Sequence, residues 1–115
     1  MLSSKLMAIH SALTAIEGLK AYHYKAPSSE TLPYCVWYED GEYSSLETDN
    51  HKAEQAIGGY VDYFTKTEFD GMVDAIQNAL NGVDNCSWSY DATIYGDPSS
   101  DSNNAIHHVF RWRVL

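Results

Sequence analysis

The sequence predicts a two-layer α+β domain with two helices on one face of a largely antiparallel or mixed sheet of four to five strands, and a long polar arm. Two segments carry apolar residues at helical spacing, and several others alternate between apolar and polar residues. One long polar stretch interrupts the run of strands. At 115 residues the chain has the length of one domain, residues 1–115.

The N-terminal segment predicts a helix from about Ser3 to Gly18. A short strand at Ala21–Lys25 and a Pro/Ser loop at Ala26–Pro33 follow. The helix is predicted because its apolar residues recur at spacings of four and three and form one stripe. The residues of this stripe are Leu2, Leu6, Ile9, Leu13 and Ile16.

The segment Tyr34–Tyr38 is apolar on both faces, which is typical of an interior strand covered on both sides. The covers could be helices on one side and another subunit on the other. The following segment, Glu39–Gln55, is polar and contains six acidic residues with Lys52 as its one basic residue. Two interpretations remain open for it: a solvated hairpin extension, or an arm that becomes ordered on a partner.

The central segment predicts a strand followed by a helix. Ile57, Val61 and Tyr63 alternate onto one strand face. Thr67 is the expected N-cap, with Asp70 three residues later near the positive end of the helix. The helix stops at Asn81-Gly82. Its apolar positions are Phe69, Met72, Val73, Ile76 and Leu80.

The C-terminal part predicts two strands, Cys86–Tyr95 and Ala105–Leu115, joined by a loop at Gly96–Asn104. The last strand has the clearest alternation in the chain. Its apolar face holds His108 with Ile106, Phe110, Trp112 and Val114, and its polar face holds His107, Arg111 and Arg113. Cys35 and Cys86 are expected to be core thiols rather than a disulfide.

Composition restricts the partners. Sixteen acidic and seven basic residues give a formal charge of −9, so sequence-independent nucleic-acid binding is not expected, and no motif for sequence-specific binding stands out. The sequence contains no apolar run long enough for a membrane helix and no clear signal-peptide core. We therefore expect a protein made in the cytoplasm with no membrane partner.

A search for catalytic or metal-binding patterns predicts no enzyme, no cofactor and no metal site. His107 and His108 are adjacent on a strand and point to opposite faces, so they cannot easily share one ion. Glu47, Asp49 and Asn50 lack the pattern of a calcium loop. Gly58-Gly59 opens a strand rather than a helix and is more typical of a close backbone approach than of a phosphate cradle.

Aromatic residues exceed what one small core can bury. The chain has three Trp, nine Tyr and three Phe. Several of them should remain on a sheet face, where aromatic side chains mark contact surfaces. The candidates are Tyr22, Tyr24, Trp37, Tyr43, Tyr60, Trp88, Tyr90 and Tyr95.

Three segments in this order and spacing resemble the tail terminator (tail completion) proteins of long, non-contractile-tailed bacteriophages and prophages. The first is an N-terminal amphipathic helix followed by the strand Leu32–Tyr38 and a polar arm with Asp49-Asn50. The second is Tyr60–Lys66 running into Asp70 and the helix. The third is the basic C-terminal strand His107–Leu115. One departure from the family is the long Ser/Asn-rich loop at Asp97–Asn104.

The resemblance implies a subunit of a ring, hexameric in the family, that sits on the end of the tail tube in the virion. Its implied partners are further copies of itself, the tail tube protein and the head-completion or connector protein. Alternatives are a neighbouring head-completion (stopper) protein, or a small ligand-binding α+β dimer outside phages. The expected subunit or tube interface combines the acidic arm with the basic last strand: Glu39, Asp40, Glu42, Tyr43, Glu47, Asp49, Asn50, His107, Arg111 and Arg113.

Overall fold

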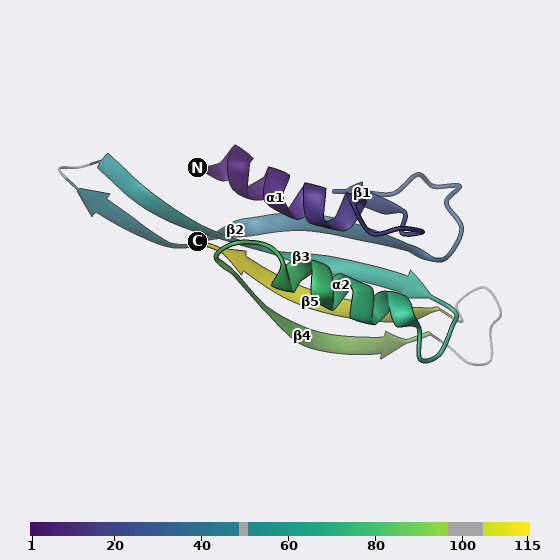
Figure 1. Cartoon of the computed structure of the whole chain (residues 1–115). Helices are drawn as coiled ribbons and strands as arrows, with labels where there is room; N and C mark the ends of the chain where they lie inside the picture. The colour runs from purple at the N-terminus through teal and green to yellow at the C-terminus, as the bar shows by residue number, and fades with distance from the viewer. Residues whose placement is uncertain (49–50, 97–104) are drawn as a thin grey trace.

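A computed structural model describes residues 1–48, 51–96 and 105–115 of the chain. In this part the sheet has the strand order β1-β2-β3-β5-β4, with β1 parallel to β2 and the other neighbours antiparallel (Figure 1). The predicted α+β architecture is confirmed. The elements are α1 (Leu2–Thr14), β1 (Ala21–His23), β2 (Tyr34–Thr48), β3 (His51–Thr65), α2 (Gly71–Asn81), β4 (Cys86–Tyr95) and β5 (Ile106–Val114).

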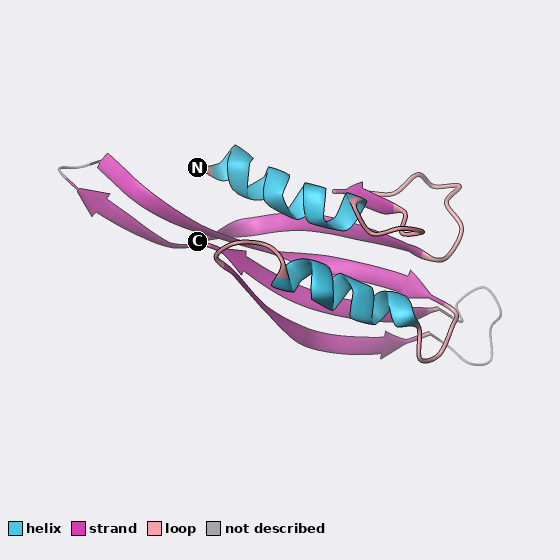
Figure 2. Cartoon of the chain, in the orientation of Figure 1, coloured by secondary structure: helices cyan, strands magenta, loops and turns pink. Residues whose placement is uncertain are grey.

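Both helices lie on the same side of the sheet, as Figure 2 shows, and one hydrophobic core fills the space between the two layers. Ile9 and Leu13 of α1 and Ile76 and Leu80 of α2 are buried completely. The sheet meets them with alternate residues of its three central strands, as the period of two requires. These sheet residues are Cys35, Trp37, Ile57, Val61, Tyr63, Phe110, Trp112 and Val114.

The first helix and strand are shorter than predicted. α1 ends at Thr14, whose hydroxyl donates a hydrogen bond to the His10 carbonyl at 2.8 Å, and the chain continues to Gly18 in turns. Leu2, predicted on the apolar stripe, is 41% exposed. β1 ends at His23 because Tyr24 has a φ of +77°, a left-handed conformation that no strand residue adopts.

The start of the second helix was also predicted wrongly. The N-cap is Asp70, whose carboxylate accepts a hydrogen bond from the Met72 N–H at 2.9 Å, so Thr67 lies before the helix. Phe69, predicted on the buried stripe, lies in the preceding loop with its side chain fully exposed. The predicted stop is confirmed, because α2 ends at Asn81 with Gly82 as its C-cap.

The polar Glu39–Gln55 segment continues both strands of the β2–β3 hairpin in its described parts, 39–48 and 51–55. β5 pairs with β3 only as far as Ile57, and β1 pairs with β2 only at residues 35–37. The hairpin therefore extends beyond the rest of the sheet, and the molecule measures 58 × 25 × 24 Å (Figure 1). The backbone of these described parts therefore has the form of a hairpin extension, which is the first of the two interpretations of this segment.

Candidate interaction face

The side of the sheet opposite the helices, which we call the open face, has no cover within the described part of the chain (Figure 2). The strand register places its residues in rows that run across neighbouring strands. Most of these side chains are half-buried by one another, although no second layer lies over them. The three rows are Tyr34–Phe64–His107, Val36–Asp62–Val109 and Tyr38–Tyr60–Arg111.

Aromatic rings dominate the open face and contact each other in series. The Tyr34 and Phe64 ring centroids are 5.2 Å apart, and the Phe64 ring stacks on His107 at 4.4 Å. In the row Tyr38–Tyr60–Arg111 the ring centroids of Tyr38 and Tyr60 are 5.7 Å apart. Such contacts between aromatic side chains hold the rings in place.

A histidine and a carboxylate lie next to each other among these rings. The Nε2 atom of His107 is 3.2 Å from Asp62 Oδ1, but the two atoms do not have hydrogen-bond geometry. Burial raises the pKa of Tyr38, and the neighbouring Asp62 carboxylate raises it further. His107, predicted on the polar face of the last strand, is three-quarters buried between Phe64 and Asp62.

Two β-bulges at the base of the arm direct further side chains to the open face. The register shifts by one residue at Asp40 and again at Tyr43. The Tyr43 ring lies directly over Gly58, where a Cβ atom would come within 1.6 Å of the ring. Glycine at position 58 therefore makes room for a side chain rather than for another backbone. At Gly59 an added Cβ atom would lie 2.0 Å from the Tyr38 carbonyl oxygen, which is the close backbone approach that was predicted.

The two arginines of β5 pack on these residues. The Arg113 guanidinium lies 4.1 Å from the Tyr43 ring centroid, and that of Arg111 lies 4.9 Å from it. Arg111 also donates a hydrogen bond to the Tyr60 hydroxyl at 2.9 Å and lies 3.9 Å from Asp40. Arg111 is therefore held within the subunit, whereas the side chain of Arg113 is exposed.

A hollow of about 210 Å³ lies between β4 and β5 beside the arginines. Ser87 is paired with Arg113 and Ser89 with Arg111 across the two strands, so two hydroxyls face two guanidinium groups. The Nε atom of Arg111 is buried without a hydrogen-bond partner among the described residues. The hydroxyl and guanidinium groups are hydrogen-bond donors, and this arrangement of donors suits a carboxylate, which accepts several hydrogen bonds at once.

Several of the residues predicted at the interface come together here, and others do not. Asp40, Tyr43, His107, Arg111 and Arg113 lie on the open face. Glu39 lies on the helix side of the sheet, where its Oε1 atom is 2.8 Å from His23 Nε2. Glu42 lies at the base of the arm, where it also interacts with another group. The Glu47 side chain, Asp49 and Asn50 lie outside the described residues.

Of the aromatic candidates, Tyr22, Tyr43 and Tyr60 lie on the open face. Trp37 was placed wrongly, because it is buried under α1. Trp88 and Tyr90 face the helix layer, and Tyr24 and Tyr95 are exposed outside the rows. Sequence reasoning missed Ser87, Ser89 and Asp62, whose position only the strand register defines.

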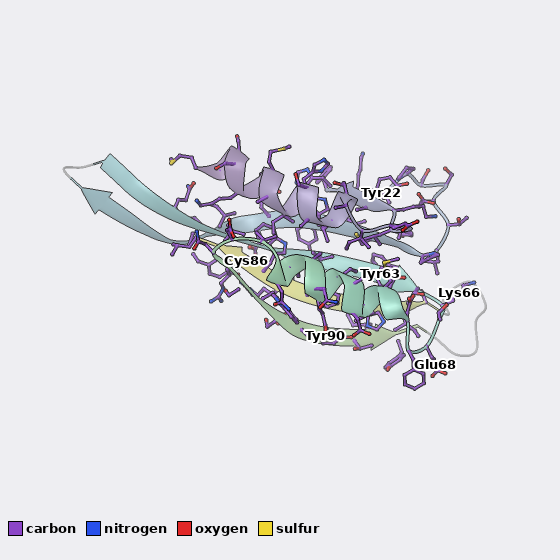
Figure 3. The ribbon with its side chains drawn as sticks, in the orientation of Figure 1. Tyr22, Tyr63, Lys66, Glu68, Cys86 and Tyr90 are labelled. Atoms are coloured by element: carbon purple, nitrogen blue, oxygen red, sulfur yellow. The ribbon has the colours of Figure 1, made fainter. Side chains whose placement is uncertain are left out.

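A second polar cluster lies at the start of α2. The Asp70 carboxylate accepts hydrogen bonds from the Tyr63 hydroxyl at 2.6 Å and the Thr65 hydroxyl at 2.8 Å. Burial raises the pKa of Asp70, but these bonds and that from Met72 N–H outweigh it and hold this pKa below its usual value. Tyr63, labelled in Figure 3, is itself buried, so the cluster fixes the junction between β3 and α2.

Neither a comparison with protein-family models nor one with curated proteins gives a match to this chain. Within residues 1–48, 51–96 and 105–115, no three potential metal ligands come together, and no helix is long and apolar enough to span a membrane. Cys35 and Cys86 are free thiols, and burial raises the pKa of Cys35 to about 12. The open face, with its rows of aromatic rings and its two arginines, is the candidate site that the described residues present.

Proposed function

We propose that this protein is the tail terminator of a long-tailed phage or prophage. In this role it assembles as a ring, hexameric as in the family it resembles, on the end of the tail tube. The ring stops tube polymerisation and forms the joint to the head connector. The order of its sequence segments supports the assignment, since they follow that of the terminator family along nearly the whole chain.

The observation that carries the proposal is the open face with the arm at its edge. Rows of half-buried aromatic rings and an exposed Arg113 form a preorganised surface of the kind found at protein interfaces. The β2–β3 hairpin extends beyond this face, and within the described residues no third strand pairs with either of its two edges. A ring joint needs such extended surfaces because each subunit must contact its neighbours as well as the tube.

The proposal is tested by polymerisation of the tail tube protein encoded beside this one. Adding the purified chain in substoichiometric amount should stop tube growth. Arg113→Glu should lose this effect while remaining folded, because its side chain is exposed. Lys66→Glu, which makes the same change of two charge units at an exposed residue after β3, is the matched control and should stop growth normally. Unaltered tube growth with the wild-type chain would contradict the assignment, and binding to the connector alone would indicate a head-completion protein.

Charge reversal of both Arg111 and Arg113 is a less clean test than charge reversal of Arg113 alone. Arg111 is bound to Tyr60 and lies beside Asp40, so Arg111→Glu would bring two carboxylates together inside the subunit. Such a change destabilises the fold as well as any interface. Arg113→Glu alone is therefore the variant for complementation of a terminator-deficient phage, with loss of infectious particles as the expected result.

A further inference from the structure

The two arginines of the chain, Arg111 and Arg113, lie close together on the open face. They are two residues apart in β5, so their side chains leave the strand on the same side. Their guanidinium groups lie 4.9 Å and 4.1 Å from the centroid of the same ring, that of Tyr43. Like charges held this close repel each other unless negative charge lies beside them.

The subunit provides negative charge to one arginine of the pair. Asp40 Oδ2 lies 3.9 Å from the Arg111 guanidinium, which also donates a hydrogen bond to the Tyr60 hydroxyl. Arg113 is exposed and packs on the Tyr43 ring, but within the described residues its guanidinium has no ion pair and donates no hydrogen bond. Its positive charge is therefore left without a local counter-charge there.

The hollow of about 210 Å³ between β4 and β5 lies beside this charge. The two strands lie next to each other (Figure 1), and their register places Ser87 opposite Arg113 and Ser89 opposite Arg111. Both serines are exposed, and neither hydroxyl is hydrogen-bonded within the described residues. No carboxylate is among the described residues that line the hollow.

Two buried polar atoms beside the hollow also have no partner among the described residues. They are the Nε atom of Arg111 and the hydroxyl oxygen of Tyr43. A buried donor without an acceptor is unfavourable. This part of the open face therefore has more hydrogen-bond donors than the described residues have acceptors for.

A carboxylate is the ligand that these donors fit. Its two oxygen atoms accept parallel hydrogen bonds from a guanidinium group and further bonds from hydroxyls. A cavity of about 150 Å³ holds a benzene ring, so the hollow has room for the carboxyl end of an acidic side chain. A nucleic-acid backbone fits less well, because its many phosphates would be repelled by a chain with a formal charge of −9.

We propose that the hollow between β4 and β5 is a carboxylate-binding site for an acidic side chain of a partner protein. Arg113 is the principal ligand of the anion, and Ser87 and Ser89 donate hydrogen bonds to it. Arg111, held by Tyr60, supplies the second positive charge. The inference names the chemistry of one contact of the proposed terminator and rests on that function for the identity of the partner.

A titration of the full-length chain, followed by nuclear magnetic resonance, tests the site. The chain has two arginines, so its spectrum contains two arginine Nε–H signals, and one variant assigns them. The probe is N-acetyl-glutamate α-amide at about pH 6, where its side chain is ionised. We expect both signals to shift and saturate with a dissociation constant on the order of 1–10 mM. The neutral N-acetyl-glutamine α-amide, and sodium chloride at equal ionic strength, should give no saturating shift.

Variants separate a built site from general attraction of anions. Arg113→Gln should weaken binding about tenfold or more, read from the remaining Arg111 signal, and Arg113→Lys about threefold, because lysine keeps the charge but loses the planar fork. Ser87→Ala with Ser89→Ala should weaken it about three- to tenfold. Lys66→Gln removes an exposed positive charge elsewhere and is the matched control, with unchanged binding expected. Equal responses to both amides, or unchanged binding by Arg113→Gln, would overturn the inference.

The same signals are followed while the chain concentration is raised and, in a separate sample, while tail tube protein is added. The sample in which they shift identifies whether a second copy or the tube supplies the carboxylate. If the chain stops tube growth but its arginine signals do not respond to the glutamate probe, the terminator assignment stands and this site is wrong. If the probe binds but tube growth is unaffected, the site stands and the terminator assignment is wrong.

Discussion

The packing of Tyr43 on Gly58 makes the sharpest prediction about the base of the arm. In Gly58→Ala the new methyl group would lie 1.6 Å from the Tyr43 ring, so the ring must leave its place. The ring then loses its contacts with Arg111 and Arg113. Overpacking costs typically about 1–3 kcal/mol, and each lost cation–π contact about 0.5–1 kcal/mol at exposed sites. We expect Gly58→Ala to lower the free energy of unfolding by about 2 kcal/mol.

Urea denaturation of a double-mutant cycle measures this effect. In a Tyr43→Ala background the obstacle is absent, and Gly58→Ala should be neutral or slightly stabilising because glycine weakens a strand interior. Gly59→Ala is the control: its methyl group would lie 2.0 Å from the Tyr38 carbonyl oxygen and 2.5 Å from the Trp112 ring. Its cost should persist in the Tyr43→Ala background. Additive costs for Gly58→Ala and Tyr43→Ala would refute the proposed packing.

Three further predictions concern the core, the helix cap and the arm. Val61→Ala and Ile76→Ala remove fully buried methyl groups and should each destabilise the fold by about 1–5 kcal/mol, measured as a lower denaturation midpoint. Because the pKa of Asp70 is lowered in the folded state, its stabilisation is complete above its unfolded pKa of about 4 and is lost as the pH falls through the folded value. Asp70→Asn should therefore flatten the acid limb of a stability–pH curve, and an unchanged limb would count against this role. In hydrogen exchange, the arm at residues 39–55 should be less protected in the free subunit than Val61, since few apolar residues offset its ordering. Equal protection would exclude an arm that a partner stabilises.

The elements that the sequence predicts well are those with strong hydrophobic periodicity. The alternation of Ile57, Val61 and Tyr63 and that of β5 are confirmed, because burying one face of a strand leaves a period of two in the sequence. The stop at Gly82 is confirmed because C-terminal glycine is a strong local signal.

The predictions that failed depend on single backbone conformations. Phe69 fits the helical spacing, but Asp70 caps the helix through a hydrogen bond to Met72 and leaves Phe69 outside it. Thr67 and Asp70 are both good caps, so the sequence could not decide between them. The bulges at Asp40 and Tyr43 produce no periodic pattern in the sequence. For that reason the packing of the arginines within the subunit could not be predicted.

The most direct test of the account is electron cryo-microscopy of tail tubes polymerised with this chain. We predict a ring of density at one end of each tube, with the symmetry of the tube and with the open face and arm of each subunit in contact with a neighbour or the tube. Tubes of unrestricted length with bare ends would contradict the assignment of this protein as a tail terminator.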